Sequence, residues 1–142
     1  MIDAEGPVLA DFEGDWRLER VIEDLKADQT LHFTGSASFI RDLDGLAYAE
    51  SGRLVLPDGS RMEASRSYRW QEEGDGRVAV HFEDGSYFHS FELATRPSAE
   101  HWCDPDSYAA SYDFSAWPRW SCRWSVNGPR KEYVMETRFW RP

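Results

Sequence analysis

The sequence predicts an all-β protein, a single antiparallel meander that closes into a β-barrel of about nine to ten strands after a short N-terminal helical turn. Apolar and polar residues alternate along most of the chain, which is typical of strands with one buried face. The aromatic content of 15% also favours strands. The connections are short, and the chain lacks the helical crossovers that parallel strands require, so neighbouring strands are expected to run antiparallel.

Closure into a barrel is favoured over an open sheet because it removes the exposed edges that a long sheet leaves. A two-sheet sandwich fits the same alternation and stays open as an alternative. Two segments have helical character. Residues Pro7 to Phe12 are predicted to form one short turn, and Val21 to Ala27 (VIEDLKA) are a second helical candidate because they are good helix formers.

In the first half of the chain, four strands are expected, each with one apolar face. The inward positions are Trp16, Leu18, Arg20 and Ile22; Leu31, Phe33, Gly35, Ala37 and Phe39; Leu46, Tyr48, Glu50, Leu54 and Leu56; and Met62, Ala64, Arg66, Tyr68 and Trp70. Gly35 indicates a bend or space kept open inside, and Gly52 indicates a bulge.

In the second half, turn signals at Gly74-Asp75-Gly76 and Asp84-Gly85 bound a fifth strand and begin a sixth. The sixth strand places Tyr87, His89, Phe91 and Leu93 inward and Phe88 on the other face. Residues 94–106 are expected to form a loop. The last three strands have inward sets Tyr108, Ala110, Tyr112 and Phe114; Trp120, Cys122, Trp124 and Val126; and Tyr133, Met135, Thr137 and Phe139.

Length and charge limit the function classes. A chain of 142 residues is expected to be one barrel domain over 1–142. The net charge of -10 argues against nucleic acid as a partner. The chain has no apolar run long enough for a membrane span and no signal-peptide pattern, so we expect a cytoplasmic protein with Cys103 and Cys122 as free thiols. Whether it is a monomer or a homodimer is left open.

The opening Gly14-x-Trp16 resembles the G-x-W signature of the calycin barrels, the lipocalins and fatty-acid-binding proteins. The resemblance implies that Trp16 packs across the closed end of the barrel against an arginine near the C-terminus, Arg138 or Arg141. A longer set of motifs resembles an uncharacterised family of small proteins known as a domain of unknown function. The motifs run over 14–20, 48–54, 66–70, 84–91, 101–108 and 124–133. This second resemblance implies a fold and no activity.

The inward polar positions are the candidate ligand site: Arg20, Tyr48, Glu50, Arg66, Tyr68, His89, Tyr108, Tyr112 and Tyr133. Two arginines and one glutamate leave one positive charge over, and charges inside a barrel must be paired, hydrated or directed at a ligand. We therefore predict a hydrophobic or aromatic small molecule with an anionic group, packed against Trp70, Phe91, Trp124 and Phe139. The alternative is structural: Arg20 pairs with Glu50, Arg66 bonds tyrosine hydroxyls, and nothing binds.

Two further functions stay open. The Arg/Glu/His/Tyr cavity suits a cofactor-independent decarboxylase, isomerase or cyclase with His89 as acid or base. A haem-binding barrel similar to nitrobindin would use His89 or His101, although GDWRLE lacks the glycines of that group's opening. No metal or other cofactor is expected, because His101, Cys103, Asp104 and Asp106 have neither zinc-site spacing nor a common face. Arg130-Lys131 is either an anion-attracting spot at the barrel mouth or a solvated hairpin tip.

Overall fold

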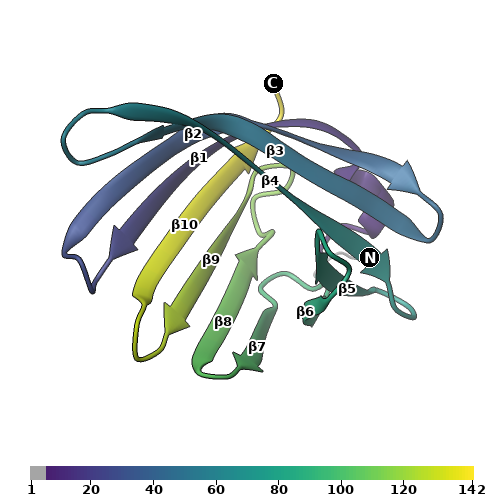
Figure 1. The fold of residues 1–142 in the computed structure, drawn as a ribbon. Coiled ribbons are helices and arrows are strands. Elements are labelled where there is room, and N and C mark those ends of the chain that lie inside the picture. Colours follow the sequence, from purple (N-terminus) through teal and green to yellow (C-terminus); the bar gives the residue numbers. More distant parts are fainter. Residues whose placement is uncertain (1–5) are drawn as a thin grey trace.

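The computed structural model describes residues 6–142, in which one antiparallel sheet of ten strands follows a 3-10 turn (Figure 1). The elements are η1 (Leu9–Phe12), β1 (Gly14–Asp24), β2 (Gln29–Asp42), β3 (Gly45–Val55), β4 (Arg61–Glu72), β5 (Arg77–Phe82), β6 (Tyr87–Glu92), β7 (Ser98–Cys103), β8 (Asp106–Asp113), β9 (Trp120–Asn127) and β10 (Glu132–Trp140). Within this part of the chain, no helix is long and apolar enough to cross a membrane.

The sheet curls into a nearly closed barrel. The strand order is β6-β5-β4-β3-β2-β1-β10-β9-β8-β7, so the meander returns on itself where β1 pairs with β10. The two edge strands, β6 and β7, lie beside each other without forming a ladder within the described chain. Aromatic rings fill this seam instead: the ring of Phe88 lies 5.9 Å from His101 and 5.6 Å from Tyr108. The predicted all-β meander barrel with a short N-terminal turn is confirmed.

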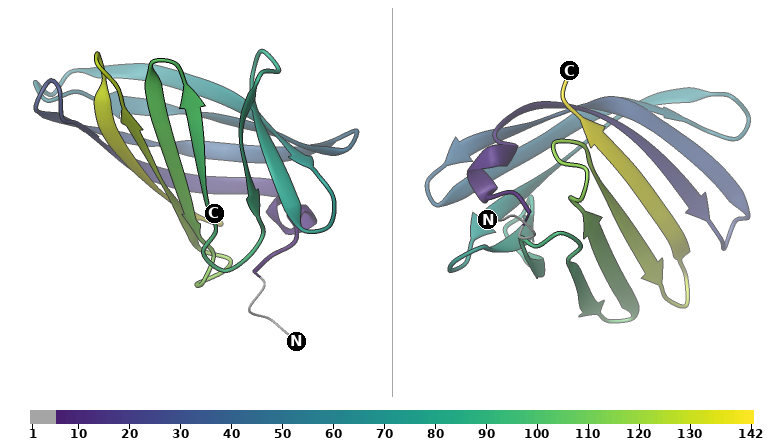
Figure 2. Two further views of the ribbon diagram at one scale, coloured as in Figure 1. Left: turned by 90° about the horizontal axis from the view of Figure 1, so that it is seen from below. Right: turned by 180° about the vertical axis from the view of Figure 1, so that it is seen from behind.

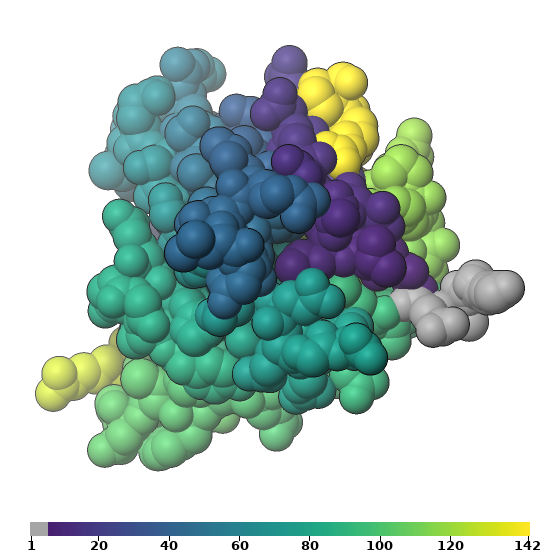
Figure 3. All heavy atoms as spheres, turned by 90° about the vertical axis from the view of Figure 1, so that its right-hand side faces the viewer, coloured from purple at the N-terminus to yellow at the C-terminus, as the bar shows by residue number. Residues whose placement is uncertain are grey.

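The N-terminal turn plugs one end of the barrel. Phe12 is fully buried, and its backbone oxygen accepts a 2.8 Å hydrogen bond from the indole Nε1 of Trp16. The guanidinium of Arg141 lies 3.8 Å over the Trp16 ring and donates to the backbone oxygens of Asp11 and Asp15. Of the two expected arginines, Arg141 is therefore the partner of Trp16. Figure 3 shows η1 filling this end between the β2–β3 and β4–β5 turns.

The two halves of the barrel differ in height. Strands β1 to β4 have 11 to 14 residues, whereas β5 to β7 have 6 each, so the β3–β4 hairpin projects past the shorter strands (Figure 2).

Gly35 pairs with Gly52 where the backbones of β2 and β3 come very close. The predicted bulge at Gly52 is wrong, because the registers of both of its ladders are regular there. The irregularity lies between Val80 and His81.

Three further predictions are corrected. Residues Val21 to Ala27 are not a helix: β1 continues to Asp24 because β2 and β10 hold it on both sides, and a turn follows. The expected loop 94–106 contains β7, which pairs with β8. Tyr87 is exposed and Phe88 is buried, the reverse of the predicted faces, because the irregular β5–β6 register shifts the alternation at the start of β6.

Candidate functional site

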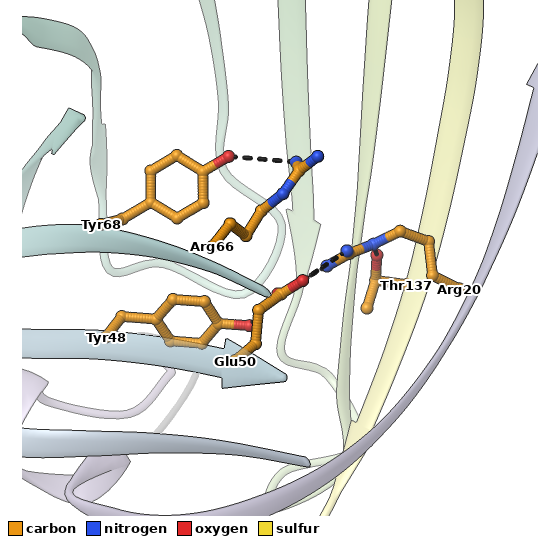
Figure 4. Close-up of polar contacts among 6 residues, drawn as sticks. All are labelled: Arg20, Tyr48, Glu50, Arg66, Tyr68 and Thr137. Carbon is orange, nitrogen blue, oxygen red and sulfur yellow. Dashed lines mark hydrogen bonds and ion pairs between the residues drawn. The ribbon is translucent and has the colours of Figure 1, made fainter. Parts of the chain in front are cut away.

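A buried ion pair spans the interior of the barrel between β1 and β3. The two terminal nitrogens of Arg20 donate to the two carboxylate oxygens of Glu50 at 2.6 and 2.8 Å (Figure 4). Alternation directs both side chains inward, and both residues are less than a tenth exposed. A bidentate pair of this kind satisfies both charges. The Arg20 to Glu50 pair of the structural alternative is therefore present.

Two neighbours complete this pair. Thr137 lies opposite Arg20 in the β1–β10 register, and its hydroxyl oxygen accepts a 2.8 Å hydrogen bond from the Nε of Arg20. The Tyr48 hydroxyl donates a hydrogen bond to the carboxylate of Glu50. Burial opposes ionisation of Glu50, but the hydrogen bonds and charge of Arg20 outweigh it and lower the pKa of the carboxyl. Burial, and then the negative charge of Glu50, raise the pKa of Tyr48 well above its usual value. The network is a fixed carboxylate–guanidinium pair with a neutral phenol.

Arg66 lies directly across the β3–β4 ladder from Glu50. The sequence predicted that Arg66 lies inside the barrel, and this is wrong because the residue is exposed. Its Nη1 donates one 3.1 Å hydrogen bond to the hydroxyl of half-buried Tyr68 (Figure 4). Among residues 6–142, no carboxylate forms an ion pair with it. The positive charge predicted to be left over inside the barrel is therefore not there: the buried Arg20 is paired with Glu50, and Arg66 is exposed.

His89 and Tyr112 form a second polar pair, deeper in the barrel. His89 is 1% exposed, and its Nε2 lies 2.8 Å from the Tyr112 hydroxyl, while its Nδ1 has no partner among the described residues. Burial lowers the pKa of His89 to about 4, with a smaller contribution from the charge of His101. No contact in the described chain joins His89 to Arg66 or Glu50. The enzyme interpretation, which depends on this histidine, and the haem interpretation, which uses His89 or His101, stay predictions.

The two remaining tyrosines lie at the rim. Tyr108 on β8 and Tyr133 on β10 are both half-buried, and both face Val126 of β9 in their ladders. The phenol of Tyr108 is the main cause that raises the pKa of Lys131, which also lies 3.4 Å from a carboxylate oxygen of Asp106. Lys131 therefore belongs to the rim. The positive charge predicted at Arg130-Lys131 is partly neutralised there, because Asp106 pairs with Lys131.

Nine residues were predicted to share one cavity, and the structure divides them among four places. Arg20, Tyr48, Glu50, Tyr68 and Tyr112 line an enclosed space of about 30 Å³ beside Trp120, Trp124 and Thr137. That volume holds one or two water molecules, because aromatic rings fill the rest. The other predicted residues lie at the mouth, at the rim or in the packed core. Thr137 and Cys122 were missed as polar members, although alternation had placed both inward.

Two indole donors beside this space lack a partner. Nε1 of Trp120 and Nε1 of Trp124 are buried without a hydrogen bond in the described part of the protein. Buried donors of this kind are commonly satisfied by an ordered water molecule. Burial raises the pKa of the Cys122 thiol, which lines the same space, to about 12, so the thiol is neutral.

One opening beside the predicted site residues Arg66 and Tyr68 lies outside the barrel. A groove of about 490 Å³ runs between β4 and the β5–β6 turn, lined by Ser65, Arg66, Ser67, Tyr68, Phe82, Glu83, Asp84 and Ser86. Strand β4 supplies the guanidinium of Arg66 and the ring of Tyr68, and the end of β5 with the following turn supplies the ring of Phe82 and two carboxylates. No group of three or more metal-ligating side chains gathers within residues 6–142.

Comparison with solved structures identifies the architecture. Six chains match, and one of them is an S-type phycobiliprotein lyase from Guillardia theta. Its TM-score is 0.65, with 9% sequence identity over 97% of this chain and 95% of that one. The barrel is therefore calycin-like, as the Gly14-x-Trp16 opening indicated.

Sequence comparisons give a narrower result. No curated protein matches the chain. One family model matches residues 12–141, nearly the whole sequence. The chain belongs to the family of unknown function DUF6314.

Proposed function

We propose that this protein binds a small molecule with an aromatic or hydrophobic body and an anionic group, and that Arg66 holds the anionic group. The observation that carries the proposal is the unpaired guanidinium of Arg66. Its cross-strand neighbour Glu50 is already neutralised by Arg20, so Arg66 has several free donors at the barrel mouth. A guanidinium with free donors suits a carboxylate or sulfonate, which it binds through two hydrogen bonds.

The groove beside Arg66 offers the space for the body of the ligand. Its volume of about 490 Å³ is in the range of small-molecule sites, whereas the enclosed space of about 30 Å³ is too small. Tyr68 and Phe82 supply aromatic surface there, in place of the buried rings expected from the sequence. Glu83 and Asp84 repel an anion from the far wall and so orient the anionic group toward Arg66.

The similar fold favours one ligand class within this description. One of the matched solved structures is a phycobiliprotein lyase, which suggests a bilin-type ligand. Bilins are open-chain tetrapyrroles with two propionate groups. A bilin combines an extended conjugated body with carboxylates, as the groove and Arg66 require. We therefore name a bilin as the second, narrower candidate.

The test is a fluorescence titration with 1-anilinonaphthalene-8-sulfonate, an aromatic anion, together with an absorbance titration with biliverdin. In the Arg66→Gln variant we expect at least about tenfold weaker binding of the sulfonate, because a hydrogen bond to a charged group contributes about 1.5–3 kcal/mol. Arg123→Gln is the matched control, because Arg123 is exposed on β9 and pairs with Glu136. Its affinity is expected to stay within about twofold of the parent.

Equal affinities of the Arg66→Gln and Arg123→Gln variants would overturn the role of Arg66. Failure of both probes to bind the parent protein would remove the proposed function. Binding of the sulfonate without biliverdin would keep the general ligand class and remove the bilin. Thermal unfolding of both variants checks that a loss of binding is not a loss of fold.

A further inference from the structure

Half of strand β4 has no partner on one side. The β3–β4 ladder covers Arg61 to Gln71, but the β4–β5 ladder covers only Tyr68 to Glu72. Residues 61–67 therefore form an open edge of the sheet within the described chain, on the hairpin that projects past the shorter strands (Figure 2). An open edge presents unpaired N–H and C=O groups that pair readily with another strand.

The alternation of hydrogen-bonded pairs along the β3–β4 ladder shows which backbone groups of β4 are free. The backbone N–H of Leu56 donates to the oxygen of Ser60, which fixes 56–60 as a hydrogen-bonded pair of the β3–β4 hairpin. Such pairs alternate along an antiparallel ladder, so the even-numbered residues of β4 bond to β3. The N–H and C=O groups of Arg61, Glu63, Ser65 and Ser67 consequently point outward from the edge.

We propose that this edge pairs with the same edge of a second copy of the chain, antiparallel and about a two-fold axis at Met62. In this register Arg61 of each copy lies opposite Glu63 of the other, which gives two cross-strand charge pairs. The two Met62 side chains, each 53% exposed in the single chain, cover one another. The occupant of the edge is thus a second molecule of this protein.

Other two-fold registers are unfavourable. An axis at Arg61 opposes two arginines, and an axis at Glu63 opposes two glutamates. An axis at Ala64 brings the hairpin turn of the second copy against Tyr68, where β5 already pairs. With the axis at Met62, that turn lies opposite 65–67, which line the groove, so the second copy narrows the groove there. Glu63 already forms an ion pair with Arg53 in the single chain, with 3.5 Å between Nε and Oε2. This pair is weak because the Glu63 side chain is 81% exposed, so Glu63 can pair with Arg61 of the second copy instead.

Charge reversal tests the pairing. Sedimentation velocity of the parent protein, without probe, is expected to show a concentration-dependent species of twice the 16.5 kDa chain mass. Glu63→Arg should weaken the association about tenfold or more, because both charge pairs become repulsive. The double variant Arg61→Glu/Glu63→Arg should restore it. A parent protein that stays monomeric up to its solubility limit, or a double variant no better than the single one, overturns the proposal.

Cross-linking tests the register. In a Cys103→Ser background, Met62→Cys places two Cα atoms in a non-hydrogen-bonded pair about 4.5 Å apart, within the range that a disulfide requires. Under mild oxidation this variant should give a covalent dimer. Ala64→Cys is the matched control on the same strand face, since its two copies lie roughly 13 Å apart along the strands in this register. Equal cross-linking of both variants, or none of either, overturns the Met62 axis.

Discussion

The buried His89 makes a quantitative prediction about stability and pH. Its ring is enclosed by Phe88, Phe91 and Trp124, and its single hydrogen bond joins Nε2 to the Tyr112 hydroxyl. Burial lowers its pKa to about 4 in the folded protein. In the unfolded chain a histidine has a pKa of about 6.5. The folded state therefore contains a neutral imidazole at pH values at which the unfolded chain takes up a proton.

The sign and size of the change in unfolding free energy with pH follow from this difference between the two pKa values. Below about pH 6.5 the unfolded state binds more protons than the folded state, so the free energy of unfolding falls as the pH falls. The fall ends near pH 4, where the folded protein also takes up the proton. A difference of about 2.5 pKa units corresponds to about 3 kcal/mol in total. Between pH 7 and pH 4.5, His89 alone should remove about 2 kcal/mol.

Urea unfolding of the parent protein and of the His89→Gln variant at pH 7 and at pH 4.5 measures the contribution of His89 to the pH dependence of stability. Glutamine stays neutral and retains a donor and an acceptor for Tyr112, while the carboxylates titrate alike in both proteins. The variant is expected to be less stable than the parent at pH 7, by an amount that shrinks by about 2 kcal/mol at pH 4.5. A stability difference that does not change between the two pH values would refute a buried, neutral His89.

Three further predictions concern the interior and the close strand contact. Glu50→Leu should cost about 3–5 kcal/mol in urea unfolding because it leaves the buried guanidinium of Arg20 unpaired, and the Arg20→Met/Glu50→Leu double variant should recover most of that loss. Gly52→Ala puts a methyl carbon 2.2 Å from a backbone oxygen of β2, so a cost of about 2 kcal/mol or more is expected by the same assay. A thiol reagent at pH 8 should modify exposed Cys103 and leave Cys122, whose pKa burial raises to about 12; rapid modification of two thiols per folded chain would contradict the raised pKa of Cys122.

The alternation of residues predicts most of the fold because each strand buries one face. It places Arg20 and Glu50 on inner faces, and the pairing of the strands then brings them together. The segment Ser98–Cys103 escaped prediction because only alternate residues are half-buried and none is fully buried, so it lacks a strong apolar face. The helix formers of 21–27 misled for another reason: tertiary pairing on both sides of β1 outweighs a small intrinsic preference.

Periodicity assigns a side chain to a face but not to a height along the barrel axis. The positions of Arg66 and Glu50 show this limit, because the two residues are cross-strand neighbours on the same face, yet one is buried and the other is exposed. Height depends on how far each hairpin extends past its neighbours, and that depends on the lengths of strands distant in sequence. Alternation therefore predicted a surplus charge inside the barrel, and only the structure shows that Arg66 lies outside it.

The same difference in strand lengths accounts for both proposals. Because β5 is shorter than β4, β4 lacks a partner over 61–67, and the space where that partner would continue is the groove beside Arg66. The inward face of this free segment ends in a guanidinium that no carboxylate of the described chain neutralises, and its outward-pointing backbone groups have no ladder. A strand extended by several residues past its neighbour thus accounts for both the proposed anion site on one face and the proposed pairing edge on its side. Lengthening β5 would remove both, so the two proposals share a structural origin but fail in different experiments.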